Sequence, residues 1–165
     1  MIKLVLLDVD GTFTDGGVYH GNDGNVTKKF NVKDGYIIAN ARKVGIDFGI
    51  VTGGNGKLLE YRAKKLKMKY LFCEVEKKED VLTKLMEETG LKMEEIAYMG
   101  DDLNDINIIK KVGFSGAPAD AVDEVLEIVD FVCAKKGGNG AVREFVETIL
   151  KKENLYEKFL KICLI

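Results

Sequence analysis

The sequence is poor in the residues that mark secreted, disulfide-bonded or membrane proteins. Among its 165 residues there is one proline, one histidine and no tryptophan, and the three cysteines are scattered with no CxxC pair. An odd number of cysteines without metal-binding spacing is typical of reduced thiols, so we expect a cytoplasmic protein. No apolar run approaches the roughly 20 residues that span a bilayer, and the N-terminal run is too short for a signal peptide.

The charge balance excludes other classes of partner. The formal net charge is −2, which provides no general attraction toward nucleic acid or an anionic lipid surface. We therefore expect neither nucleic acid nor a membrane as a partner. Apolar residues make up 46% of the chain, enough for a sizeable core. With no evident repeat or low-complexity tract, the length favours one domain over residues 1–165.

Strand-like and helix-like patterns alternate along the chain. A run rich in turn residues, "GNDGN", lies between two short strand-like runs and predicts a β-hairpin over about 17–31. The other runs predict an α/β fold, a three-layer, Rossmann-like and mostly parallel sheet with helices on both faces and the hairpin inserted after the first strand. The expected strands are 3–9, 46–54, 69–75, one beginning at 96, 112–116 and 130–134; the expected helices are 34–44, 56–67, 78–89, 103–111, 120–128 and 140–152, followed by an amphipathic stretch over 154–164.

Carboxylates and a hydroxyl follow three of the expected strands. Asp8 and Asp10 come after the first strand, Thr52 after the second, and Asp101 and Asp102 after a later one. Ligands of such sheets bind beyond the carboxyl ends of the strands, so these groups should converge if their strands are neighbours. Carboxylates packed together need a cation, and oxygen ligands favour Mg²⁺.

This arrangement is suited to phosphoryl transfer. With a metal and a lysine neutralising the repulsion between anions, Asp8 could attack phosphorus. Asp10 could protonate the leaving oxygen and later accept a proton from water. Thr52 could hold phosphoryl oxygens, and the segment "EVEKKEDVL" offers Lys77 and Lys78 at the start of a helix.

The four motifs "DVDGT", "VTGG", a lysine that opens a helix, and "GDDLND" occur in the order found in haloacid dehalogenase-like phosphohydrolases, which the chain resembles over essentially its whole length. The resemblance implies that Asp8 is the nucleophile and a metal ligand, and that Asp10 is the acid and base and gives its carbonyl oxygen to Mg²⁺. It also implies that Thr52 and Lys78 bind the phosphoryl group and that Asp101 is the third metal ligand. Two further acidic residues would orient metal-bound waters and the lysine: Asp102 and Asp105.

Longer stretches, among them "KKFNVKDGY", "YRAKKLK" and "GGNGAVREFVE", resemble the 3-deoxy-D-manno-octulosonate 8-phosphate phosphatase family. The register of "EVEKKEDVL" against this family favours Lys78 over Lys77. These small enzymes lack a cap domain, assemble as homotetramers and act on phosphates of eight- and nine-carbon keto-sugar acids. Gly54 and Ala39 stand where octulosonate phosphatases carry arginines, so the sequence leaves the sugar acid open. The resemblance implies these substrate contacts: Asp10, Asn31, Val32, Lys33, Asp34, Gly35, Thr52, Gly53, Arg62, Lys65 and Lys78.

Other interpretations of these segments are open at this point. Residues 31–35 could be only the entry to a helix with Asp34 as its cap, and Arg62 and Lys65 could belong to a solvated basic face. A phospho-acceptor switch is disfavoured, because in such proteins the phosphorylated aspartate stands alone on a later strand, whereas here Asp8 and Asp10 follow the first strand. Two alternatives are a phosphatase-like regulatory or oligomerisation domain of a sialic-acid-type pathway and a phosphatase of another small phosphomonoester.

Overall fold

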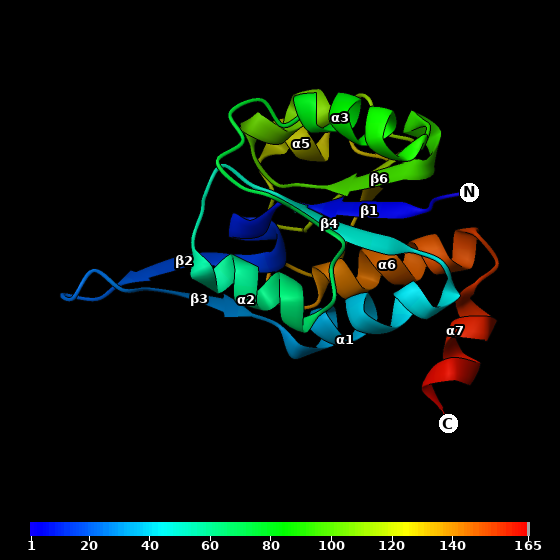
Figure 1. The fold of residues 1–165 in the computed structure, drawn as a ribbon, viewed down its shortest axis with the longest axis horizontal. Coiled ribbons are helices and arrows are strands. Elements are labelled where there is room, and N and C mark those ends of the chain that lie inside the picture. The colour runs from blue at the N-terminus through cyan, green and yellow to red at the C-terminus, as the bar shows by residue number, and fades with distance from the viewer. Residues whose placement is uncertain (165) are drawn as a thin grey trace.

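The centre of the computed structural model, which describes residues 1–164, is a six-stranded sheet (Figure 1). All five neighbouring pairs are parallel, in the order β5-β4-β1-β6-β7-β8. This arrangement confirms the predicted α/β fold. The strands are β1 (Leu4–Leu7), β4 (Asp47–Val51), β5 (Tyr70–Phe72), β6 (Ile96–Met99), β7 (Phe114–Ala117) and β8 (Phe131–Val132).

Helices cover both faces of this sheet, as Figure 1 shows. In β1, Val5 and Leu7 pack on one face while Leu4 and Leu6 pack on the other, so the strand is apolar throughout. The first face carries α1 (Val32–Ala41), α2 (Lys57–Lys65), α6 (Ala141–Lys152) and α7 (Tyr156–Cys163); the second carries α3 (Asp80–Thr89), α4 (Ile106–Ile109) and α5 (Asp123–Leu126). Within residues 1–164, no helix combines the length and hydropathy needed to cross a membrane.

The hairpin projects from the sheet at the left of Figure 1 and consists of β2 (Thr14–His20) and β3 (Val26–Phe30). It begins earlier than predicted, because Thr14 already pairs with Phe30. The register then shifts before Val18 pairs with Lys28, so the intervening residues form a bulge.

Several helix boundaries differ from the predictions. The expected helix 103–111 is a 3₁₀ turn, Leu103–Asp105, followed by the four residues of α4, because the Gly113 N–H bonds to the carbonyls of Met93 and Ile96 and the chain must turn there. The expected helix 120–128 shrinks to α5, since Val122 is extended and donates its N–H to the Asp101 carbonyl. The helix expected over 34–44 is α1 followed by a 3₁₀ turn.

Candidate active site

Three neighbouring strands bring the predicted side chains together. β1 pairs with β4 on one side and β6 on the other, and all three end at the same edge of the sheet. Asp8, Thr52 and Asp101 follow these strands. The polar residues meet around a cavity of about 280 Å³, lined by Asp8, Asp10, Thr52, Gly53, Gly54, Asp102 and Asn104.

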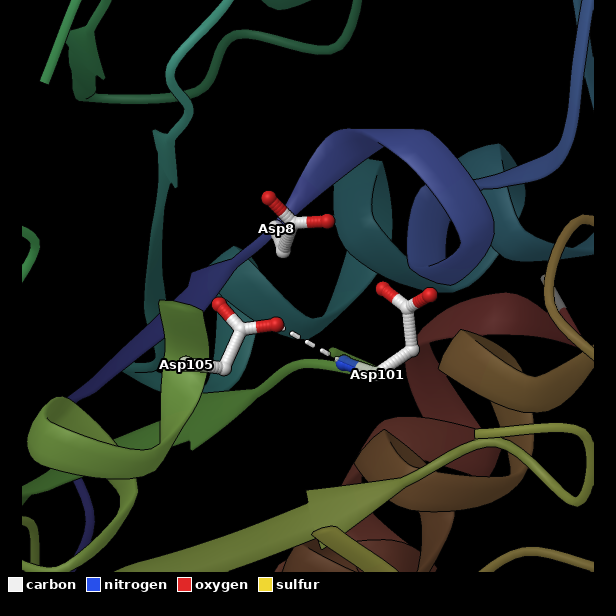
Figure 2. A group of neighbouring side chains, drawn as sticks. All are labelled: Asp8, Asp101 and Asp105. Carbon is white, nitrogen blue, oxygen red and sulfur yellow. Dashed lines mark hydrogen bonds between the residues drawn. The ribbon is translucent and has the colours of Figure 1, made fainter. Parts of the chain in front are cut away.

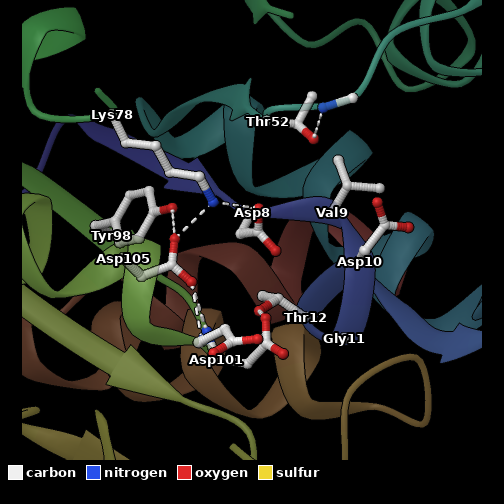
Figure 3. A network of polar contacts seen from close by, with 12 residues as sticks. Asp8, Val9, Asp10, Gly11, Thr12, Thr52, Lys78, Tyr98, Asp101 and Asp105 are labelled. Atoms are coloured by element: carbon white, nitrogen blue, oxygen red, sulfur yellow. Dashed lines mark hydrogen bonds and ion pairs between the residues drawn. The ribbon is translucent and has the colours of Figure 1, made fainter. Parts of the chain in front are cut away.

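A buried lysine bridges two of the carboxylates, as Figure 3 shows. Lys78, only 2% exposed, donates from Nζ to Oδ1 of Asp8 at 2.5 Å and to Oδ1 of Asp105 at 2.7 Å. The Tyr98 hydroxyl, on β6, donates to the same oxygen of Asp105 at 2.5 Å. Charge-assisted bonds of this kind hold both partners in one geometry. Lys78 therefore fixes the orientation of Asp8 from the buried side of the site.

Asp105 is surrounded by donors. Besides Lys78 and Tyr98, it accepts bonds at Oδ2 from the backbone N–H of Asp101 at 2.9 Å and of Asp102 at 3.1 Å. Figure 2 shows the first of these bonds between Asp105 and the Asp101 backbone. Because both oxygens are engaged, Asp105 is better suited to orient Lys78 and the loop after β6 than to bind a metal.

A divalent cation fits between the remaining carboxylates. Ligand oxygens of Asp8, Asp101 and Asp105 all lie within 4.8 Å of one another. With Asp105 engaged by its donors, Asp8 and Asp101 provide two anionic oxygens on one side of a cation. Mg²⁺ commonly uses one or two protein carboxylates and fills its octahedral shell with water and phosphate oxygens. Mg²⁺ is the cofactor that this donor set fits.

The electrostatics of the site agree with a cation there. Burial, and after it the charge of Asp105, raises the pKa of Asp8 to about 8 against the opposing effect of Lys78. Burial also raises the pKa of Asp101 to about 6, although a bond from the Thr12 hydroxyl opposes the change. For Lys78, burial lowers the pKa, but Asp8 and Asp105 outweigh burial and raise it. A bound divalent cation would favour the ionised form of both ligand carboxylates.

Two glycines allow close packing around the loop that follows Asp8. Gly11 has φ +91°, and a Cβ there would lie 2.1 Å from Oδ2 of Asp101. A Cβ on Gly137 would lie 1.8 Å from the carbonyl oxygen of Gly11. The Gly138 N–H also donates to the Thr12 carbonyl. The loop before α6 therefore packs directly against the loop after β1, and this close contact requires glycine at positions 11 and 137.

The comparisons with known proteins agree with this geometry. Residues 74–145 match the haloacid dehalogenase-like hydrolases. The 3-deoxy-D-manno-octulosonate 8-phosphate phosphatase KdsC of Escherichia coli K12 is 41% identical over 149 residues, covering 90% of this chain and 79% of that enzyme. The chain belongs to this phosphatase family. The Yersinia pestis member is 40% identical over 156 residues, covering 94% of this chain and 83% of its own length.

Solved structures of family members superpose closely on the chain. The Moraxella catarrhalis phosphatase, in complex with magnesium, phosphate and KDO, has a TM-score of 0.94 at 34% identity, covering 97% of this chain and 92% of that one. The cobalt-bound Haemophilus influenzae enzyme has a TM-score of 0.92 at 34% identity, covering 99% and 97%. The predicted resemblance is thereby confirmed, and the chain is a phosphatase of the haloacid dehalogenase-like class.

The segment 31–35 lies outside the lining of the pocket at Asp8. Asn31 accepts bonds at Oδ1 from the N–H groups of Lys33 and Asp34, so Asn31 and not Asp34 caps α1. The Asp34 side chain is fully buried and accepts a bond from the Arg143 N–H at 2.8 Å. Val32, in contrast, is 84% exposed. Their predicted role in substrate binding stays a prediction.

Arg62 and Lys65, two of the basic residues of α2, also lie outside the lining of this pocket. The guanidinium of Arg62 lies 5.0 Å from the ring centre of Phe30 and 5.7 Å from that of Phe13. Lys65 is exposed, with its Nζ 5.9 Å from the ring centre of Tyr61. Arg62 thus packs at the base of the hairpin, and the predicted substrate contacts of both residues stay predictions.

Four polar residues of the site were missed from the sequence. Thr12 binds Asp101, Tyr98 binds Asp105, Asn104 lines the pocket, and Lys28 contacts Asp10. The residue alternation in β3 could have indicated Lys28, because it shares a face with apolar Phe30. The tyrosine of β6 gave no such signal, since an aromatic residue in a buried strand normally packs in the core.

Proposed function

We propose that the chain hydrolyses the phosphate ester of an eight- or nine-carbon keto-sugar acid, of the octulosonate 8-phosphate or nonulosonate 9-phosphate type, through a phosphoaspartate on Asp8. The observation that carries the proposal is the convergence of Asp8, Asp10, Thr52, Lys78 and Asp101 in a chain that is 41% identical to an octulosonate 8-phosphate phosphatase. We assign the whole chain, residues 1–165, to one capless domain.

In the first half-reaction, Asp8 attacks phosphorus while the bond from phosphorus to the ester oxygen breaks. Lys78 engages Oδ1 of Asp8, so we assign the attack to Oδ2. Asp10 gives its proton to the leaving oxygen. The Thr52 hydroxyl and the ammonium of Lys78 stabilise the phosphoryl oxygens. Mg²⁺, held by Asp8, Asp101 and the Asp10 carbonyl, would neutralise the charge of the phosphoryl group.

In the second half-reaction, water attacks the phosphoaspartate. Asp10, now a carboxylate, accepts a proton from that water, and the bond between phosphorus and Asp8 breaks to release phosphate. Asp10 is partly exposed, with 41% of its side chain accessible. This exposure suits a group that must reach both the leaving oxygen and a solvent molecule.

The substrate is tested with a panel of phosphorylated keto-sugar acids, with 4-nitrophenyl phosphate as the reference. We expect kcat/KM for one eight- or nine-carbon member to exceed that for the aryl phosphate by at least about tenfold. Equal values across the panel would favour the alternative of another small phosphomonoester. A matched variant, Gly54→Arg, sharpens the test, because it introduces the arginine that octulosonate phosphatases carry at this position. The side chain has room to begin there, since a Cβ at Gly54 would lie 3.6 Å from Thr52 Oγ1, an ordinary contact distance.

We further propose a cytoplasmic homotetramer in which a neighbouring subunit encloses the substrate. Support comes from the exposed apolar side chains of the hairpin, Val18, Tyr19 and Val26, since an isolated two-stranded hairpin is marginally stable in water. Deleting residues 19–29 should break the tetramer in light scattering. A truncated chain that is still tetrameric would contradict this assembly.

A further inference from the structure

The hairpin contributes one side chain to the catalytic loop. Lys28, in β3, places its Nζ 2.9 Å from Oδ2 and 2.7 Å from Oδ1 of Asp10. Its side chain is 11% exposed, whereas the side chain of the next residue, Lys29, is 53% exposed. The two lysines are neighbours in a strand, and their side chains differ about fivefold in exposure. Lys28 points toward Asp10, whereas Lys29 donates to Asn139 Oδ1 at 3.0 Å and lies 3.5 Å from Asp15 Oδ2.

The position of Lys28 is determined by the fold around it. Its stem borders a cavity of about 250 Å³ between β3 and the start of α2, lined also by Val26, Asn55, Gly56 and Leu58. Phe30, two residues further on the same face of β3, packs edge-on against Phe13 with ring centres 5.0 Å apart. This contact anchors β3 to the loop that carries Asp10, so Lys28 meets Asp10 through packed elements.

The Asp10 carboxylate is paired with this lysine. Among residues 1–164, Lys28 is the one side chain that forms a hydrogen bond or ion pair with the Asp10 carboxylate. An ammonium in contact with both carboxylate oxygens restricts rotation of the group. A general acid must lie within hydrogen-bond reach of the leaving oxygen, and a misplacement of about 1 Å can cost about 100-fold in rate.

We propose that Lys28 is a positioning residue for the acid and base of the reaction, so that the hairpin takes part in catalysis by orienting Asp10. This inference rests on the role of Asp10 under the proposed function but not on the identity of the sugar acid. It does not require Lys28 to touch the substrate.

Lys28→Met tests the proposal because it keeps the apolar stem and removes the charge. Two aryl phosphates serve as substrates: phenyl phosphate, whose leaving oxygen is basic and needs a proton, and 4-nitrophenyl phosphate, whose leaving group needs one much less. We expect kcat/KM for phenyl phosphate to fall about 10- to 100-fold and that for 4-nitrophenyl phosphate to fall less. Inhibition by inorganic phosphate should stay within about twofold, and Lys28→Arg should recover part of the loss.

Lys29→Met is the matched control and should retain wild-type rates. In the Asp10→Asn background, adding Lys28→Met should cause no further loss, since the lysine acts through Asp10. An equal loss for both substrates, an additive double variant, or much weaker inhibition by phosphate would overturn the proposal. If Asp10→Asn alone kept full activity, the proposed role of Asp10 would fail first, and this result is distinguishable from the others.

Discussion

Two aspartates of this chain, Asp105 and Asp34, are completely buried, and their surroundings differ. Asp105 accepts bonds from Lys78, from Tyr98 and from two backbone N–H groups. Asp34 accepts one bond from the Arg143 N–H at Oδ1, and its Oδ2 has no hydrogen-bond partner among residues 1–164. Burial raises the pKa of Asp34 above its usual value, against the opposing bond from Arg143.

The two aspartates lie in two regions that differ in how fully their buried polar atoms are hydrogen-bonded. Asp105, in the acidic centre between β1 and β6, has both oxygens satisfied by groups of the same chain, as expected for a group that preorganises a catalytic site. The region of Asp34 and Arg62, near the base of the hairpin, contains buried polar atoms that have no partner within the described part of the chain. A buried unpaired polar atom costs about 1–3 kcal/mol. The difference shows that Asp105 is held by several donors, whereas Asp34 and Arg62 each keep one buried polar atom without a partner among residues 1–164.

Removing the nucleophile should have the largest effect. Asp8→Asn places an amide, which cannot form the phosphoenzyme, at the centre of the first region. We expect turnover of 4-nitrophenyl phosphate to fall below detection in steady-state assays. Asp123→Asn, an exposed aspartate in α5, is the control and should behave as wild type. Near-normal hydrolysis by Asp8→Asn would show that the covalent mechanism is wrong.

Lys78→Met should destabilise the fold most. It leaves the buried carboxylates of Asp8 and Asp105 without their common cation, and breaking a buried pair in this way costs about 3–5 kcal/mol. The free energy of unfolding in urea measures the effect. The neighbouring Lys77 is exposed, and Lys77→Met should change stability by no more than about 0.5 kcal/mol. Equal effects of the two substitutions would contradict the assignment of the buried lysine.

Gly137→Ala should damage both the fold and the metal site. Its Cβ would collide with the Gly11 backbone, and overpacking of this kind costs about 1–3 kcal/mol. Because Gly11 abuts Asp101, the Mg²⁺ concentration for half-maximal activity should rise. Gly90→Ala, at φ +71° in open space, should cost about 1–2 kcal/mol through backbone strain alone. An unchanged Mg²⁺ requirement in Gly137→Ala would show that the loop does not support the site.

Asp34→Asn should have a small, pH-dependent effect. The pKa of Asp34 is raised from 3.8, so in wild type the folded state holds this proton to higher pH than the unfolded state. Its contribution to stability is therefore present below pH 3.8 and is lost as pH rises through the folded pKa. The variant should lose less stability than wild type over that window in urea unfolding, while the exposed Glu87→Gln should follow wild type. Parallel pH profiles of Asp34→Asn and wild type would contradict this account.

Much of the first region could be predicted because its residues follow strand ends. Asp8, Thr52 and Asp101 could be placed together once a parallel sheet was expected, and Lys78 followed from its register in the motif. The alternation in β3 could have indicated Lys28, but the register shift of β2 against β3, between Thr14 and Val18, gave no signal in the sequence. The helices predicted at α4 and α5 were longer than the observed ones. Backbone hydrogen bonds to other loops end α4 early and delay the start of α5.

The most direct test of the covalent chemistry is to locate the phosphoryl group during turnover. The protein is mixed with octulosonate 8-phosphate and Mg²⁺, quenched in acid within the first turnover, and digested for peptide mass spectrometry. We predict one phosphorylated peptide, modified at Asp8 and absent from Asp8→Asn. Rapid hydrolysis with no phosphorylated peptide, or with the phosphoryl group on another residue, would contradict the account.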